Sequence, residues 1–273
     1  MNPPIPYLHG LCVGDVTVQY DRHLHKYRVQ LKTTHPAMEK VFIKAFQPYS
    51  IDGIIRKYPV KGGATPYEWT LYTWIPQWLG EVLSNRDSHV VKVYEKSLDE
   101  LIAFISGLMD SDGSIIISIK RRRRLNYTPL VEYEISIYSS NRPLLINIKD
   151  VLAKYGIKMN LRKNSDVTRK TKRKGHVIVW QLYTSKTSEI TKLLSFLLKY
   201  MKNEDRIEKA LLLKRMIKGE IPKDPTLISK LRNKINSKIM KEVNKYIKDA
   251  ERCYKNKIKY LIYQDGIYIK SSK

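Results

Sequence analysis

The feature that most constrains this fold is a nine-residue pattern that occurs twice in the chain. The second copy, residues 105–113, reads ISGLMDSDG, and the first, residues 8–16, reads LHGLCVGDV. Upstream of the second copy, Ser97 and Glu100 have the S-x-x-E spacing of a helix-capping box, and apolar residues recur behind them at helical spacing. The pattern therefore predicts that each copy forms the end of a buried helix.

Small residues lie four positions apart in both copies. They are Gly10 and Gly14 in the first copy and Gly107 and Ser111 in the second. Two small residues at this spacing share one helix face and allow a second helix backbone to come close. We therefore expect these four residues to pack two helices together about an internal pseudo-two-fold axis.

One acidic residue falls at the same position of both copies, Asp15 in the first and Asp112 in the second. A carboxylate at a helix C-terminus is disfavoured by roughly 0.3–1 kcal/mol, because that end carries partial negative charge. A solvated Asp-Gly turn would explain the second copy alone, with Gly113 in the left-handed conformation that ends many helices. The repetition of the acid instead favours a functional role for both carboxylates.

The two motifs resemble those of the single-chain LAGLIDADG homing endonucleases. The second motif is a close match, whereas the first carries Val13 in place of its first Asp and Val16 in place of its final Gly. Over residues 8–218 the resemblance implies an α+β fold of two αββαββα repeats, whose antiparallel sheets form a saddle over DNA. It also implies a cut in both strands of one long, asymmetric duplex site by a protein that acts as a monomer.

The resemblance assigns roles to particular residues. It implies that Asp15 and Asp112 are catalytic and bind Mg²⁺ or another divalent cation. Hard cations of this kind take oxygen ligands, and a pair of them can activate water for phosphodiester hydrolysis. A basic residue near the end of each repeat often supports catalysis in the family. Lys202 and Arg206 lie in the matching zone of the second copy, with a solvated helix face as the alternative interpretation for both.

The organisation of the chain supports a repeat. We expect a first repeat with its linker at residues 1–96, a second repeat at residues 97–218 and a basic C-terminal extension at residues 219–273. Two stretches that read WTLYT and WQLYT, at 69–73 and 180–184, correspond between the repeats. The extension reads as a long helix followed by a hairpin around an Asp-Gly turn, and it contains no motif of the family.

The charge of the chain points to a polyanion. Lys and Arg number 51 against 26 Asp and Glu, so the net charge is 51 − 26 = +25. Nucleic acid is the first candidate partner and an acidic membrane surface is the alternative. No apolar run approaches the roughly 20 residues of a membrane span, and the start of the sequence lacks a signal-peptide pattern. With two cysteines we expect a reducing, intracellular location in the cytoplasm near the nucleoid, with an organelle as the alternative.

Polar and basic side chains alternate with apolar ones along the predicted strands, so they define exposed faces that can contact DNA. The predicted contacts are Gln19, Arg28, Gln30, Lys32, Arg56 and Thr70 in the first half and Ser118, Lys120, Lys158, Asn160, Arg162 and Gln181 in the second. The adjacent loop residues Arg121, Arg122, Arg123 and Arg124 are expected to bind phosphates, and a solvated loop is the alternative interpretation.

The leading hypothesis is a site-specific homing endonuclease encoded within an intron or an intein. The alternatives are non-cleaving nucleic-acid-binding proteins, either a maturase that acts on intron RNA or a domesticated DNA-binding regulator. Retention of both Asp15 and Asp112 favours the enzyme, because a protein that only binds nucleic acid has no need for paired acids at helix ends.

Overall fold

The chain forms two compact units in the computed structural model, which describes residues 2–63, 65–121, 129–171, 175–263 and 268–272. One unit contains Met1–Arg86 and Asn236–Lys273, and the other contains Asp87–Ile235. The C-terminal part of the chain therefore belongs to the first unit. None of the helices in the described ranges is both long and apolar enough to cross a lipid bilayer.

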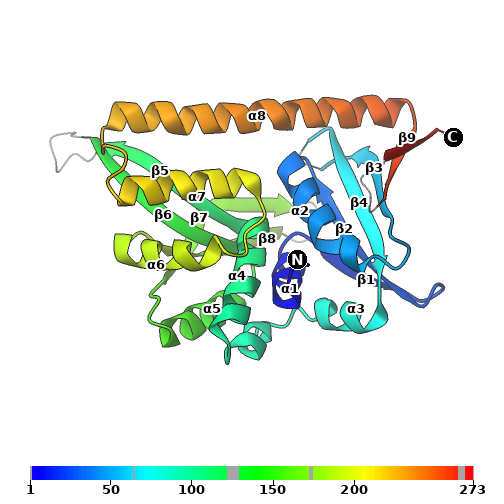
Figure 1. The fold of residues 1–273 in the computed structure, drawn as a ribbon, viewed down its shortest axis with the longest axis horizontal. Coiled ribbons are helices and arrows are strands. Elements are labelled where there is room, and N and C mark those ends of the chain that lie inside the picture. The colour runs from blue at the N-terminus through cyan, green and yellow to red at the C-terminus, as the bar shows by residue number, and fades with distance from the viewer. Residues whose placement is uncertain (1, 64, 122–128, 172–174, 264–267, 273) are drawn as a thin grey trace. The chain divides into compact units, whose positions relative to one another are not determined.

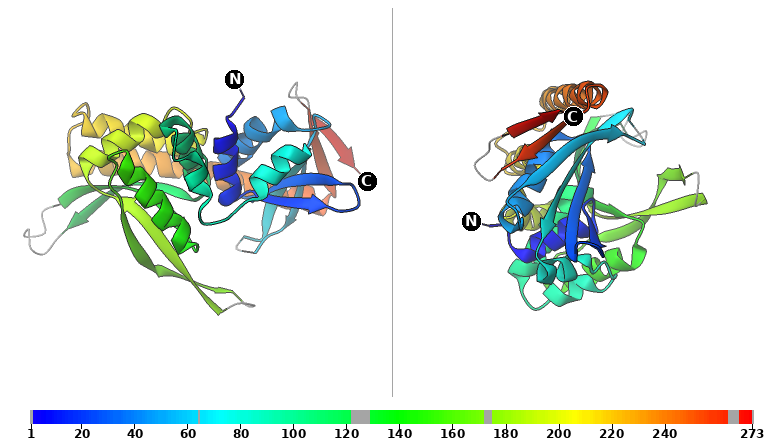
Figure 2. Two further views of the ribbon diagram at one scale, coloured as in Figure 1. Left: turned by 90° about the horizontal axis from the view of Figure 1, so that it is seen from below. Right: turned by 90° about the vertical axis from the view of Figure 1, so that its right-hand side faces the viewer.

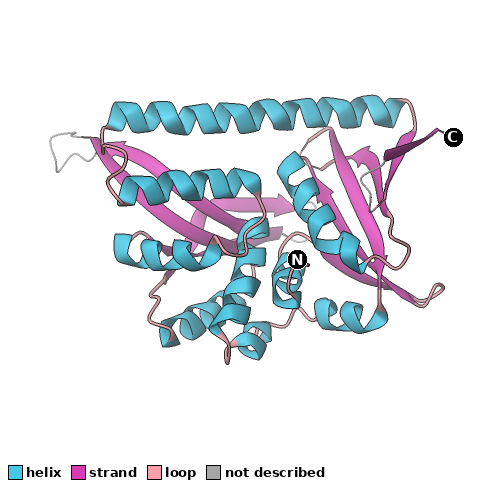
Figure 3. Ribbon diagram, viewed as in Figure 1, coloured by secondary structure: helices cyan, strands magenta, loops and turns pink. Residues whose placement is uncertain are grey.

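Each unit is built from helices and one antiparallel sheet (Figures 1 and 3). The first unit contains α1 (Ile5–Val13), β1 (Thr17–Asp21), β2 (Lys26–Thr33), α2 (Pro36–Phe46), the 3-10 turn η1 (Gln47–Tyr49), β3 (Ile55–Lys61), β4 (Tyr67–Ile75), α3 (Gln77–Ser84), most of α8 (Pro225–Lys255), β9 (Ile258–Ile262) and β10 (Tyr268–Ser272). The second contains η2 (Val90–Tyr94), α4 (Leu98–Asp112), β5 (Gly113–Arg121), β6 (Pro129–Ser139), α5 (Arg142–Lys154), β7 (Asn160–Thr171), β8 (Gly175–Thr184), α6 (Thr187–Leu197), α7 (Glu204–Ile217) and the start of α8.

The two units share one topology. The strands are ordered β1-β2-β4-β3 in the first sheet and β5-β6-β8-β7 in the second, and every neighbouring pair is antiparallel. In both, one helix precedes the first strand, a second lies between the two hairpins and a third follows the last. The predicted α+β fold of two αββαββα repeats is confirmed.

The core of each unit lies between its helices and one face of its sheet (Figure 2). In β2 the buried residues Val29 and Leu31 alternate with the half-buried Arg28 and Gln30, as the period of two predicts. In the second unit Ile135 and Ile137 of β6 are buried beneath α4 and α6. The opposite face of each sheet carries the alternate, more polar residues.

The C-terminal extension completes the first unit. β9 pairs with β3, so that Ile262 lies opposite Ile55, and β10 pairs with β9. The first sheet therefore has six strands, whereas the described part of the second has four. The two predicted strands of the hairpin are present, and its Asp-Gly turn lies outside the described residues.

Two expectations about the second repeat are corrected. Gly113 has φ −83° and ψ 164°, so it is extended and not left-handed. Glycine is required there by space, since a Cβ would lie 2.5 Å from Met109 Sδ and 2.6 Å from the Met109 carbonyl oxygen. Lys158 was expected on a strand but lies before β7, where its backbone N–H donates to the Glu189 carboxylate at 2.9 Å.

Candidate functional site

Asp15 lies on the connection from α1 to β1 and is exposed. The altered final motif residue, Val16, is compatible with this placement. Its side chain is buried, and its N–H donates to the Leu11 carbonyl at 3.1 Å. The degenerate first motif therefore still ends its helix directly before the acid.

Asn85 and Arg86, which follow α3, form hydrogen bonds with α1 and with the residue after Asp15. The Arg86 guanidinium donates to the Val16 carbonyl, and His9 Nε2 lies 2.6 Å from the Asn85 carbonyl. Burial lowers the pKa of His9, so the ring is neutral near pH 7 and its Nε2 hydrogen can be donated to that carbonyl. These contacts hold the helix end that precedes Asp15.

Asp112 is the last residue of α4 and is half-buried where the chain enters β5. The helix begins as the capping-box spacing predicts, because Ser97 Oγ accepts a hydrogen bond from the Glu100 N–H at 3.4 Å. Each unit thus places one carboxylate at the junction between its first helix and its first strand.

The other acid of the second motif, Asp110, has a different environment. It is fully buried, and its Oδ2 accepts a 2.6 Å hydrogen bond from the backbone N–H of Lys202. Asn203 Nδ2 donates to the Asp110 carbonyl at 3.3 Å. Asp110 therefore anchors the α6–α7 connection against the end of α4, which brings the backbone of Lys202 to the helix end that carries Asp112.

Arg206 caps the C-terminus of α4. Its guanidinium donates to the carbonyl of Met109 and, at 2.6 Å, to the carbonyl of Ser111. The last carbonyls of a helix have no partner within the helix, and a cation there offsets the negative end of the dipole. Arg206 thereby compensates for an acid-rich helix end.

Replacing Arg206 with Ala should destabilise the second unit by about 2–4 kcal/mol, because a buried acceptor that loses its donor costs roughly 1–3 kcal/mol. Chemical denaturation measures the loss. Arg215→Ala is the matched control, since Arg215 is exposed on the same helix and pairs with Glu220 at 3.4 Å. Equal stability of the two variants would contradict the capping role.

Arg86 is a site residue that the sequence motifs did not predict. Arg86 lies two residues after α3, and Arg206 lies in the first turn of α7, which follows α6. Each donates to carbonyls beside the acid-bearing junction. The signal available was position, because both are basic residues that follow the helix after the last strand of a repeat.

Tyr72 is the centre of the open face of the first sheet. The guanidinium groups of Arg28 and Arg56 each lie 5.7 Å from its ring centroid, on neighbouring strands. The rings of Tyr58 and Trp74 lie 5.9 and 6.4 Å away. Burial raises the pKa of Tyr72, so its hydroxyl keeps its proton and can donate a hydrogen bond. Tyr58, Tyr72 and Trp74 were not among the predicted DNA contacts. The strand pairing puts them on the same face of the sheet as Arg28 and Arg56.

Both arginines of this face already have polar partners within the unit. Arg28 donates to Gln19 Oε1 at 2.7 Å, and Arg56 pairs with Asp52 at 2.6 Å. The Arg56 contact holds the pKa of Asp52 below its ordinary value, although burial acts in the opposite direction as the largest influence. The guanidinium groups are therefore oriented in the free protein.

The open face of the second sheet carries acids as well as bases. Arg162 pairs with Glu134 at 3.0 Å, and Lys120 pairs with Glu132 at 2.9 Å. Arg162 also lies 4.0 Å from the centroid of the Tyr183 ring. Its positive charge is shared with an acid, which makes this face less basic than its arginine and lysine content indicates.

Two predicted contact residues are not exposed. Thr70 has no exposed surface, and Gln181 is 3% exposed. Gln181 accepts a hydrogen bond from Arg162 Nε at 2.8 Å and donates one to Glu134 at 2.7 Å. It therefore helps to hold the Arg162 and Glu134 side chains in place on the open face. The alternation predicted the correct face of the sheet for both residues but not their burial. Neighbouring side chains cover the short Thr70 side chain and the hydrogen-bonded Gln181 side chain.

The remaining predicted residues are placed as follows. Gln19, Lys32, Lys120, Asn160 and Arg162 are exposed, whereas Arg28, Gln30, Arg56, Ser118 and Lys202 are half-buried. Arg122, Arg123 and Arg124 lie outside the described residues, as does the side chain of Arg121. Because α1 and α4 belong to different units, the packing role of Gly10, Gly14, Gly107 and Ser111 stays a prediction.

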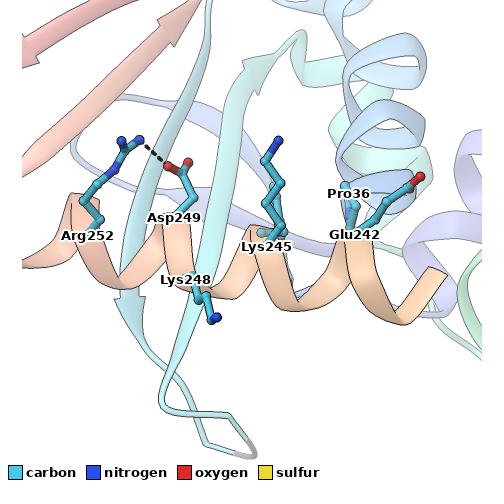
Figure 4. Close-up of a pocket in the computed structure, with 7 residues that line it drawn as sticks. Pro36, Glu242, Lys245, Lys248, Asp249 and Arg252 are labelled. Carbon is cyan, nitrogen blue, oxygen red and sulfur yellow. Dashed lines mark hydrogen bonds and ion pairs between the residues drawn. The ribbon is translucent and has the colours of Figure 1, made fainter. Parts of the chain in front are cut away.

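A pocket of about 580 Å³ lies beside α8 in the first unit (Figure 4). Pro36 at the start of α2 lines it together with residues of α8. In Figure 4, Lys245 and Asp249 point to one side of α8 and Lys248 to the other. This pocket is on the side of the sheet that α2 and α8 cover, so it is separate from the open face around Tyr72.

Comparisons with known proteins agree with this geometry. Residues 99–196 match the LAGLIDADG-like domain family. Among solved structures, I-SmaMI bound to an uncleaved DNA target in the presence of calcium ions is 10% identical, with 85% of this chain and 99% of that chain covered and a TM-score of 0.52. The I-SmaMI LAGLIDADG homing endonuclease bound to cleaved DNA is 9% identical, with 89% and 95% covered and a TM-score of 0.51.

The LAGLIDADG meganuclease I-AabMI bound to uncleaved DNA is 12% identical, with 85% of this chain and 97% of that chain covered and a TM-score of 0.50. No curated protein matches the chain at a significant level of sequence similarity. At these identities the structural likeness establishes the fold, which is that of the single-chain LAGLIDADG proteins. The match at residues 99–196, which includes the second motif, and the shared fold agree with the resemblance that the motifs indicate.

Proposed function

We propose that the protein is a site-specific DNA endonuclease that makes a metal-dependent double-strand break in a long, asymmetric site. The observation that carries this proposal is the repeated junction of helix and strand, which presents Asp15 in one unit and Asp112 in the other. Each junction leads directly into a sheet whose open face carries arginine and aromatic side chains. The DNA-bound state of the similar solved structures supports duplex DNA as the partner.

The chain's own residues bind and orient the duplex. Arg28 and Arg56 flank Tyr72 on the open face, where each would exchange its contact with Gln19 or Asp52 for one with a guanine edge in the major groove. In the second unit Arg162 would exchange its contact with Glu134 for one with DNA. The unlike faces of the two sheets favour an asymmetric site, because each half would select different bases.

The donor chemistry of the two acids fits Mg²⁺ or another divalent cation. Asp15 is exposed and Asp112 half-buried, both at helix C-termini, where the partial negative charge also favours a cation. We propose that these two carboxylates hold the metal together with phosphate oxygens of the DNA. The bound cations would supply an activated water and stabilise the charge of the transition state. Lys202, whose backbone on the α6–α7 connection is hydrogen-bonded to Asp110 near the end of α4, is proposed to support this chemistry.

In the described part of the chain, no cluster of three His, Cys, Asp or Glu side chains could hold a metal ion. The proposed site instead combines one acid from each repeat with the DNA. Since one chain supplies both acids, we propose a monomer with internal pseudo-two-fold symmetry. The family resemblance also favours an origin within an intron or an intein, which the sequence of the surrounding locus would test.

Replacing Arg28 with Ala tests the DNA-binding face. The variant should bind a site selected from random duplexes by the wild type more weakly, by about 1–3 kcal/mol for one lost paired base contact, and should bind random DNA nearly as before. Lys248→Ala, which removes the same charge from α8, is the control. If both variants bind the selected site equally well, the open face does not read DNA.

A further inference from the structure

The first sheet is wider than the second on the side away from its acid. Its strand order is β1-β2-β4-β3-β9-β10, and β1 is the strand that directly follows Asp15. The added hairpin is therefore the part of the sheet most distant from Asp15 in strand order. Over the described residues, the second sheet ends at β7, the counterpart of β3.

The residues of β9 divide between the two faces of this sheet. Ile258 and Ile262 are buried, and the Tyr260 ring lies 5.8 Å from that of Trp69 in the core. Alternation therefore puts Lys259 and Leu261 on the open face. The register confirms this side, since Leu261 lies opposite Arg56, whose guanidinium group is above the Tyr72 ring.

We propose that the β9–β10 hairpin extends the DNA-binding surface of the first unit and that Lys259 binds a backbone phosphate in the outer flank of the site. This inference rests on the proposed function. Lys259 is exposed and continues the face formed by Arg56, Tyr58 and Tyr72. A lysine ammonium is a compact point charge, which suits phosphate contacts that position a protein without reading bases.

The width of the hairpin predicts how much additional DNA the first unit contacts. Neighbouring strands lie about 4.7–4.9 Å apart, so the hairpin widens the sheet by about 10 Å. At about 3.4 Å for each base pair, this corresponds to about three base pairs. The contacted DNA should therefore reach about three base pairs further from the cut on the side of the first unit than on the other.

The experiment combines a protein variant with a shortened duplex. Wild type, Lys259→Ala and the charge-matched control Lys248→Ala are titrated with salt on the site selected by the wild type, and on two versions that each lack the outermost three base pairs at one end. Each lost phosphate contact should reduce the slope of log K against log salt by about 0.9. Lys259→Ala should show that reduction on the full site and no further reduction when one particular end is removed.

Wild type and Lys248→Ala should both lose about 0.9 of slope when that same end is removed. If wild type binds duplex DNA but Lys259→Ala behaves as Lys248→Ala does on all three duplexes, the hairpin proposal is overturned and the proposed function stands. A wild-type protein that binds no duplex would overturn both.

Discussion

Replacing Asp112 with Asn is expected to lower the rate of DNA cleavage by at least roughly 10²–10³-fold, the size of losing one electrostatic stabiliser of the transition state. The amide keeps the shape of the side chain but removes the charged oxygen that a divalent cation requires. Binding to the selected site should survive, because the open faces of the sheets are unchanged. Cleavage under single-turnover conditions and equilibrium binding measure the two effects separately.

Asp110 provides a matched control for this prediction within the same motif. It is fully buried and accepts a hydrogen bond from the Lys202 N–H at 2.6 Å, so Asp110→Asn should lower stability by about 1.5–3 kcal/mol. At a temperature where both variants are folded, Asp112→Asn should be the more severely impaired in cleavage. Cleavage by Asp112→Asn at the parent rate would exclude Asp112 from the site.

The second large effect concerns a buried ion pair that connects α2, β3 and α8. Lys57 Nζ lies 2.8 and 2.7 Å from the two Glu39 carboxylate oxygens and 4.2 Å from the centroid of the Trp69 ring, and the Tyr246 hydroxyl donates to Glu39. Replacing Glu39 with Met should destabilise the first unit by about 3–5 kcal/mol, because it leaves a buried ammonium without its counter-charge. Urea denaturation measures the loss.

The double replacement Glu39→Met with Lys57→Met distinguishes charge from packing. It removes both ions and keeps similar volume, so it should be far less destabilising than the single change. The same cluster receives Tyr246 from α8 and Tyr260 from β9, and the single variant should therefore also loosen the hairpin. A double variant as unstable as the single one would show that the charge of Lys57 is not the cause.

Local patterns were sufficient to predict the repeat and the faces of its strands. The capping box at Ser97, the alternation in β2 and the two acids at helix ends all depend on residues close together in the chain, and the structure contains those elements. The same reasoning placed Arg28 and Arg56 on one face, since a period of two fixes the direction of every side chain in a strand.

What the sequence could not predict depends on contacts between distant segments. Arg206 binds carbonyls about 95 residues earlier, and β9 pairs with a strand some 200 residues before it, so neither has a local signature. The burial of Thr70 and Gln181 likewise follows from side chains on neighbouring strands. The predicted left-handed conformation of Gly113 was wrong. A glycine is needed at this position because Met109 leaves no space for a Cβ, and not because the backbone is left-handed.

The most direct test of the central claim is to incubate the purified protein with a library of randomised DNA duplexes and Mg²⁺ and to sequence the cleaved ends. We expect breaks in both strands within one long, non-palindromic site, lost when EDTA is added and lost in the Asp112→Asn variant. Selective binding of duplex DNA with no cleavage of any sequence in Mg²⁺ or another divalent cation would contradict the endonuclease assignment and favour a non-cleaving DNA-binding protein.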